Sequence, residues 1–185
     1  RIEHGPTTRA LFPYAFAAVL GGSLVALGPM FALIVRPTPW FNARYLVEIS
    51  GMMMSSAMNV VAQVFERIFA SAETEARAIE QRLALGASPV QALRPHVRAA
   101  LRAAMIPTIN GLVTVGLVSL PGMMTGQILS GADPEQAVRY QLVIMYQLVA
   151  VAAVSGGLAA TLARRLLFTR SALLRSFAAP DARET

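Results

Sequence analysis

An uninterrupted apolar stretch near the start of the chain is the feature that most restricts its fold. Residues Ala10 to Val35 include no charged side chain. This stretch exceeds the roughly 20 residues that, at about 1.5 Å per residue, carry an α-helix across the hydrocarbon core of a bilayer. Because a lipid-exposed segment must satisfy its own backbone hydrogen bonds, we expect a transmembrane helix here.

The composition extends this expectation to the whole chain. Hydrophobic residues make up 55% of the sequence and charged residues only 14%, and the mean hydropathy is +0.54. Such values are typical of membrane proteins rather than soluble domains. The net charge of +6 does not indicate nucleic-acid binding, because the arginines that carry it lie mostly between or after apolar stretches. The absence of cysteine excludes disulfides and thiolate metal sites in this chain.

Three further apolar stretches follow the first. Together the four predict membrane spans at about 10–35, 45–69, 98–120 and 137–163. Between them we expect a cytoplasmic loop at 72–97 and an outer, glycine-rich segment at 121–136 that is too short to span. The predicted fold is an all-α integral membrane protein, a polytopic helical bundle that forms one transmembrane domain over residues 1–185.

The loop between the second and third spans has unusually clear helix boundaries. An amphipathic helix that starts near Ala72 should end at Gly86. Ser88 then suits an N-cap, Pro89 the first helical position, and Gln91 the third position of a capping box. Since Pro95 lacks an amide donor, we expect this new helix to last only about two turns.

The run LGASPVQALRPHVRAALRAAMIP, from Leu85 to Pro107, resembles the cytoplasmic EAA loop of ABC-transporter permeases. In that loop a short coupling helix sits in a groove of the ATPase subunit. The Glu-Ala-Ala that opens many such loops is absent, and Glu80-Gln81-Arg82 stands near its place. The resemblance assigns ATPase coupling to Glu80, Leu85, Gly86, Ala87, Ser88 and Pro89.

A second run, GLVSLPGMMTGQILSGADPEQAVRYQ from Gly116 to Gln141, closely resembles the FetB/YbbM family of permease subunits. The resemblance implies a small ABC system associated with iron export, with plant relatives linked to aluminium tolerance. It also implies an ATPase on a separate chain that binds ATP and Mg²⁺, a second permease copy, and further spans before Arg1. One departure is that the usual Gly-Met-x-x-Gly-Asn-x-Met appears here as Gly-Met-Met-Met-Ser-Ser-Ala-Met, starting at Gly51.

Polar and methionine residues within the predicted spans are candidates for a translocation path. Intramembrane polar groups are costly and are therefore often functional. Methionine can also fill gaps between helices, Glu48 can be a solvated interfacial group, and Thr108 and Asn110 can satisfy the backbone freed by Pro107. The candidates are Glu48, Met52, Ser56, Asn59, Thr108, Asn110, Met123, Met124, Gln127, Tyr140 and Gln141. Their pattern identifies no metal-ligand set.

The arginines predict how the chain is oriented. Arg36, Arg44 and Arg139 fall on one side of the predicted spans and the remaining arginines on the other. Because cytoplasmic loops are enriched in basic residues, both ends of the chain and the EAA-like loop should be cytoplasmic. The expected location is the inner membrane of a bacterium, with the chain spanning it several times.

We interpret the chain as a non-enzymatic transport subunit. It has no glycine-rich phosphate loop with lysine, so the ATP-hydrolysing subunit should be another chain, and no nucleotide or other cofactor is expected here. A membrane-embedded enzyme is disfavoured because His4 and His96 are its only histidines and no carboxylates are paired. A permease for a non-metal substrate and a structural membrane protein without transport activity remain alternatives.

Overall fold

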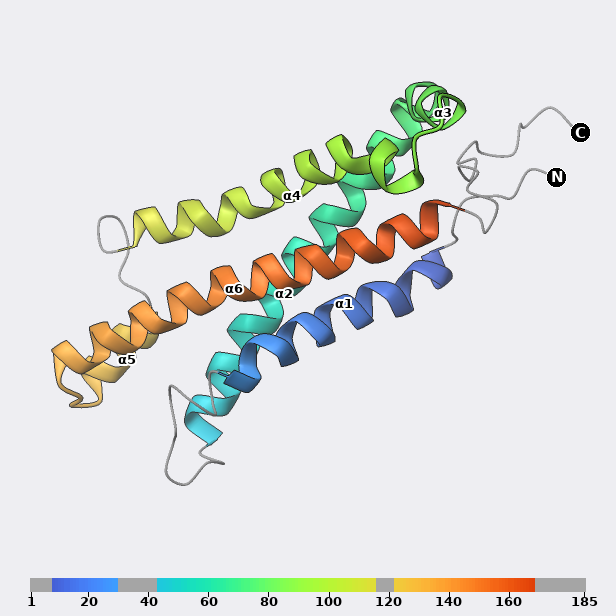
Figure 1. The fold of residues 1–185 in the computed structure, drawn as a ribbon. Coiled ribbons are helices and arrows are strands. Elements are labelled where there is room, and N and C mark those ends of the chain that lie inside the picture. The colour runs from blue at the N-terminus through green and yellow to red at the C-terminus, as the bar shows by residue number, and fades with distance from the viewer. Residues whose placement is uncertain (1–7, 30–42, 116–121, 169–185) are drawn as a thin grey trace, which may run out of the picture.

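In the computed structural model, six α-helices are described, within residues 8–29, 43–115 and 122–168. They are α1 (Thr8–Pro29), α2 (Ala43–Thr74), α3 (Ala76–Ala84), α4 (Pro89–Thr114), α5 (Gly122–Leu129) and α6 (Pro134–Leu167). The four long helices lie side by side in an elongated bundle, with α3 at one end and α5 at the other (Figure 1). The predicted all-α bundle is confirmed.

Helix α6 is the central element, because it packs against α1, α2, α4 and α5. The side of α2 that faces this bundle carries apolar residues at helical spacing. They are fully or almost fully buried: Ile49, Met53, Ala57, Val61, Val64, Ile68 and Ala72. Such a stripe follows from the 3.6-residue period and fixes which side of α2 meets its neighbours.

Two small residues allow helices to approach closely. A Cβ built on Gly22 of α1 would lie 2.0 Å from Ser155 Oγ and 2.8 Å from Ser155 Cα on α6. A Cβ on Gly156 would lie 3.0 Å from Val60 Cγ1 of α2 and 3.2 Å from Leu101 Cδ2 of α4. Helix α6 therefore packs closely against α1 at Ser155 and against α2 and α4 at Gly156. Small residues permit such close packing in membrane helix bundles.

Two of the described helices are long and apolar enough to cross a membrane, Leu11–Pro29 and Pro134–Leu167. The other two predicted spans coincide with α2 and α4, which are of sufficient length but contain more polar residues. The prediction of four spans is therefore not confirmed by apolarity, and α2 and α4 remain predicted spans. The parts of the first and third spans at 30–35 and 116–120 lie outside the described residues.

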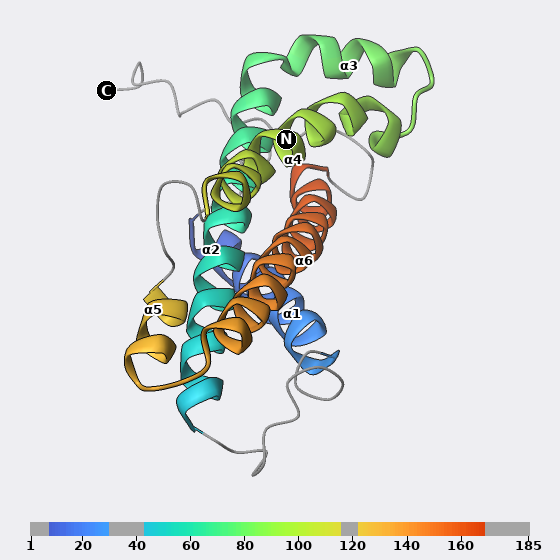
Figure 2. The same ribbon diagram turned by 90° about the vertical axis from the view of Figure 1, so that its left-hand side faces the viewer.

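The predicted end of the coupling helix at Pro95 was wrong. Helix α4 continues without interruption from Pro89 through Pro95 and Pro107. It bends instead, so that its first turns lie beside α3 and the rest runs along the bundle (Figure 2). Burial of Leu93 and His96 on either side of Pro95 holds these turns in place and offsets the missing backbone hydrogen bond.

The amphipathic helix predicted from Ala72 to the Gly86 corner is also divided. Helix α2 ends at Thr74 and α3 starts at Ala76, with Glu75 between them at φ −111° and ψ 24°. Ala72 of α2 and Ile79 of α3 are both completely buried. The division turns α3 away from the bundle axis (Figure 2).

Candidate functional site

A cleft of about 750 Å³ lies between α2, α4 and α6. Helix α2 contributes one face of residues at spacings of three and four, and α4 contributes the segment around Pro107. Besides small and apolar groups, the lining includes amides, hydroxyls and two thioethers. The residues that carry these groups are Met52, Ser55, Ser56, Asn59, Gln63, Thr108, Thr114 and Met145.

This cleft brings together four of the predicted path residues, Met52, Ser56, Asn59 and Thr108. Ser55 and Ser56, which replace the family's Gly-Asn, both line it. Gln63 and Met145 were not predicted. Gln63 was within reach of sequence reasoning, because it lies one helical turn after Asn59 on the same face. Met145 had no such signal, since only tertiary packing places α6 at the cleft.

The other predicted path residues lie elsewhere. Gln127 and Tyr140 line a second, smaller cavity of about 260 Å³ at the junction of α5 and α6. Neither cavity includes Glu48 and Asn110, which are exposed, or Met123, Met124 and Gln141 of α5 and α6. The structure therefore divides the predicted set between two places and leaves five of its members outside both.

Gln141 is the most unusual of these residues. Its side chain is only 4% exposed, and among the described residues neither its amide oxygen nor its amide nitrogen has a hydrogen-bond partner. An unsatisfied buried amide costs roughly 1–3 kcal/mol. Gln127 of α5 is also buried, at 8% exposure. The α5–α6 end of the molecule thus holds two buried side-chain amides.

The electrostatics of the cleft are neutral. Among the residues that the structure describes, its lining contains no carboxylate, histidine or arginine. Across the described residues, no group of three or more His, Asp or Glu side chains is arranged to hold a metal ion. Neutral oxygen and thioether groups can contact an ion or a small polar molecule in passing, but they favour weak binding.

The corner between α3 and α4 has the geometry that the sequence predicted. Gly86 adopts φ +90°, a conformation that side chains disfavour, and it turns the chain after α3. Ser88 Oγ accepts a hydrogen bond from the Gln91 backbone N–H at 3.3 Å, and Gln91 Oε1 accepts one from the Ser88 backbone N–H at 2.9 Å. This reciprocal capping box fixes the start of α4.

The tip of this corner is apolar and unusually exposed. Leu85 is 88% exposed and Val90 is 54% exposed. Behind them, Arg82 Nη1 donates to the Ala92 carbonyl at 3.2 Å and ties α3 to α4. The corner is thus a braced projection with apolar side chains at its end.

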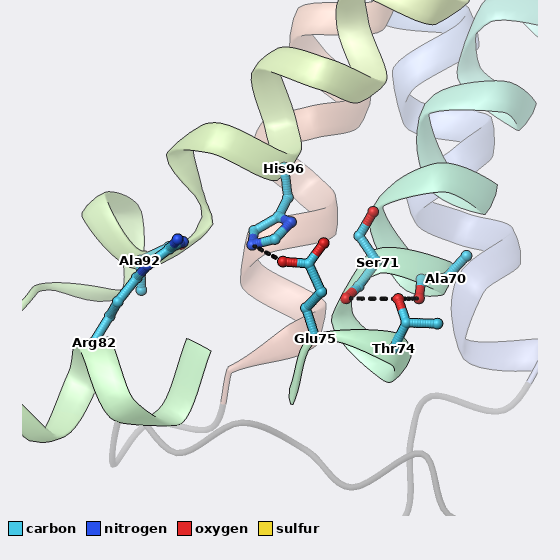
Figure 3. A network of polar contacts seen from close by, with 7 residues as sticks. All are labelled: Ala70, Ser71, Thr74, Glu75, Arg82, Ala92 and His96. Atoms are coloured by element: carbon cyan, nitrogen blue, oxygen red, sulfur yellow. Dashed lines mark hydrogen bonds and ion pairs between the residues drawn. The ribbon is translucent and has the colours of Figure 1, made fainter. Parts of the chain in front are cut away.

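A buried histidine links the corner to α2. His96 is 6% exposed, and its Nε2 lies 3.8 Å from the Glu75 carboxylate, an ion-pair distance that is too long for a hydrogen bond (Figure 3). Glu75 occupies the break between α2 and α3, so the contact spans from that break to the bend in α4. Sequence reasoning missed this pair because its members lie far apart in the chain and only tertiary packing brings them together.

Comparison with known proteins identifies the family. The profile described as "Uncharacterised protein family (UPF0014)" matches residues 2–168. The chain belongs to this family. The UPF0014 membrane protein slr1647 of Synechocystis is 40% identical over 76% of the chain and 54% of its own length. No solved structure matches the chain significantly.

Two further relatives of the chain carry descriptive names. The Escherichia coli protein named "Probable iron export permease protein FetB" is 35% identical over 85% of the chain and 60% of its own length. The Arabidopsis protein "ALUMINUM SENSITIVE 3" is 34% identical over 95% of the chain and 62% of its own length. The resemblance drawn from the sequence is confirmed, and membrane location follows from the family. The chain spans between about half and two thirds of these relatives.

Proposed function

We propose that this chain is the membrane-spanning permease part of an ABC transporter that exports metal ions, iron among them, with energy from a separate ATPase. The α3–α4 corner is the observation that carries the proposal. A capped, braced projection that ends in an exposed leucine fits a groove on a partner protein, and burial of such a side chain favours association. The name of the E. coli relative supports the direction and the substrate.

In this proposal the coupling surface consists of Glu80, Leu85, Gly86, Ala87, Ser88 and Pro89. ATP with Mg²⁺ binds the partner chain and not this one. The contacts of the corner suit force transmission, because Arg82 connects α3 to α4 and Glu75 connects the end of α2 to His96. A movement of the corner would therefore reach α2 and α4, two of the three helices that border the cleft.

The cleft between α2, α4 and α6 is the proposed path. Two of its lining residues on α2, Ser55 and Asn59, are exposed, so the cleft is open on one side of the chain. A second permease copy placed against this side would enclose the path between two chains, as the family resemblance implies. The neutral lining suits a substrate that binds briefly and is released. The chain is placed in a bacterial inner membrane with both ends cytoplasmic.

The lack of a metal-ligand cluster among the described residues favours one alternative, a permease for a non-metal substrate. This alternative shares the coupling corner and the path and differs only in the cargo. A test of function must therefore measure ATPase binding and the identity of the substrate separately.

The decisive experiment measures ATP hydrolysis by the co-purified ATPase in liposomes with the full-length permease, across a panel of metal ions. We expect one ion to stimulate hydrolysis and Gly86→Arg to abolish ATPase binding. Gly131→Arg is the matched control, because Gly131 also follows a short helix at φ +88° and neither glycine has an atom within 4 Å of a built Cβ. Backbone strain is thus similar in both variants, and only their position differs.

Three results would count against the proposal. If Gly86→Arg and Gly131→Arg lose ATPase binding equally, the loss reflects misfolding rather than a specific contact at the corner. A wild-type chain that binds no ATPase would favour a structural membrane protein. Binding and hydrolysis without stimulation by any metal would leave the permease in place and support a non-metal cargo.

A further inference from the structure

A second surface feature lies on α4, away from the cleft and the corner. A groove of about 750 Å³ is lined by Arg94, Val97, Arg98, Leu101, Arg102 and Met105. Three arginines and three apolar residues therefore alternate along one stretch of helix. The proposed function gives this groove no role.

The three arginines form one basic row. They recur every fourth residue, so they lie on the same side of α4 over roughly 12 Å at 1.5 Å per residue. All three are exposed. Within the part of the chain that the structure describes, no carboxylate oxygen lies within 4.0 Å of their guanidinium nitrogens. The row thus has charge that the described chain does not neutralise.

The apolar residues form a parallel row. Val97, Leu101 and Met105 are half-buried and pack against the hydrophobic core. Leu101 packs close to Gly156 of α6, since a Cβ added to that glycine would lie 3.2 Å from Leu101 Cδ2. One edge of the groove is therefore cationic, while its floor is apolar and packs against the core.

The position along α4 matches the boundary of a bilayer. The row starts six residues after the Ser88 cap and is followed by the uncharged segment Ala103–Thr114. In the orientation proposed above, these arginines lie where the helix enters the cytoplasmic leaflet. Arginine side chains at such a depth extend toward the headgroups while their stems cover apolar surface.

We propose that this groove binds an anionic phospholipid, with its phosphate on the arginine row and an acyl chain along Val97, Leu101 and Met105. The combination of both rows favours a lipid over an acidic surface of the ATPase, because a protein partner of the arginines does not require the adjoining apolar channel. The inference depends on the proposed function only for the membrane depth of α4. The bound lipid would hold the part of α4 between the coupling corner and the cleft.

The test uses the full-length permease without ATPase, in mixed micelles of phosphatidylglycerol and phosphatidylcholine. Native mass spectrometry counts the lipids that remain bound. We expect the wild type to retain phosphatidylglycerol preferentially and Arg98→Gln with Arg102→Gln to weaken retention by roughly fivefold per arginine. The matched control is Arg67→Gln with Arg77→Gln, which removes two exposed arginines of α2 and α3. Its net charge equals that of the Arg98→Gln and Arg102→Gln double variant.

Further readouts separate a lipid site from misfolding or from a protein contact. Arg98→Lys with Arg102→Lys should retain most of the preference, since the positive charge remains. Equal retention of the two lipids by the wild type would overturn the proposal, as would an equal loss in the control variant. Unchanged lipid retention in the glutamine variant, with loss of ATPase binding, would assign the row to the ATPase instead. Because lipid retention is measured without ATPase or substrate, its result is independent of transport.

Discussion

At the scale of single residues, the tightest constraint is the meeting of Gly22 on α1 with Ser155 on α6. No side-chain atom fits between them, because a Cβ on Gly22 would lie within 3 Å of both the side chain and the Cα of Ser155. Nearby, the Gln147 side-chain amide donates to the Ala26 carbonyl and fixes the same pair of helices. This close approach determines the separation of α1 and α6, and hence the shape of the bundle.

Gly22→Ala should therefore destabilise the protein. The added methyl group forces α1 away from α6, and overpacking of this kind costs about 1–3 kcal/mol. Thermal unfolding in detergent should show a lower midpoint. Gly28→Ala on the same helix is the control, since nothing lies within 4 Å of its built Cβ, and its midpoint should not fall. Ser155→Gly should restore only part of the loss in the Gly22→Ala background, because the new methyl group still clashes with the α6 backbone.

At the scale of elements, local sequence determines where α4 starts, and tertiary packing determines that it continues through Pro95. The capping box at Ser88 is a local device, formed by residues three apart, and the sequence predicted it correctly. The continuation through Pro95 is a tertiary effect. Leu93 and His96 are buried, and the Ala92 carbonyl accepts a hydrogen bond from Arg82, so leaving the helix at Pro95 would lose these interactions.

Ser88→Ala should loosen the coupling corner without unfolding the bundle. Loss of an N-cap side chain costs about 1 kcal/mol, which corresponds to roughly fivefold faster local opening. Hydrogen exchange should accelerate at the amides of Val90 to Ala92, while the thermal midpoint stays nearly constant. Thr161→Ala on α6 is the comparison, because that hydroxyl only donates to the Leu158 carbonyl within its own helix. Unchanged exchange in Ser88→Ala would contradict the assigned role of the cap.

At the scale of the whole molecule, the two short helices mark opposite ends of the bundle. Helix α3 and the α3–α4 corner lie at one end, and α5 lies at the other (Figures 1 and 2). The end that carries α3 and the first turns of α4 is also the more arginine-rich. If the bundle spans a membrane as proposed, the two ends face different compartments.

Cysteine labelling can test this orientation directly, because the chain contains no cysteine of its own. Leu85 and Leu129 are matched positions for cysteine substitution, because each is 88% exposed and they lie at opposite ends of the bundle. A membrane-impermeant maleimide is added to spheroplasts, in which the outer membrane has been removed and the inner membrane is intact. It should label Leu129→Cys and not Leu85→Cys. Labelling of both end positions from outside would contradict the proposed topology.

The amino-acid sequence alone was enough to predict the helical bundle, the membrane class, the Gly86 corner and its capping box. Each of these follows from local composition, spacing or turn chemistry, which act within a few residues. Tertiary packing was needed to show that α4 passes through Pro95, that α2 breaks at Glu75, and that Glu75 meets His96. Likewise, packing selected Met52, Ser56, Asn59 and Thr108 as neighbours in one cleft and placed Gln141 elsewhere. These outcomes depend on interactions between residues distant in the chain, whose burial energies outweigh local preference and leave no periodic trace in the sequence.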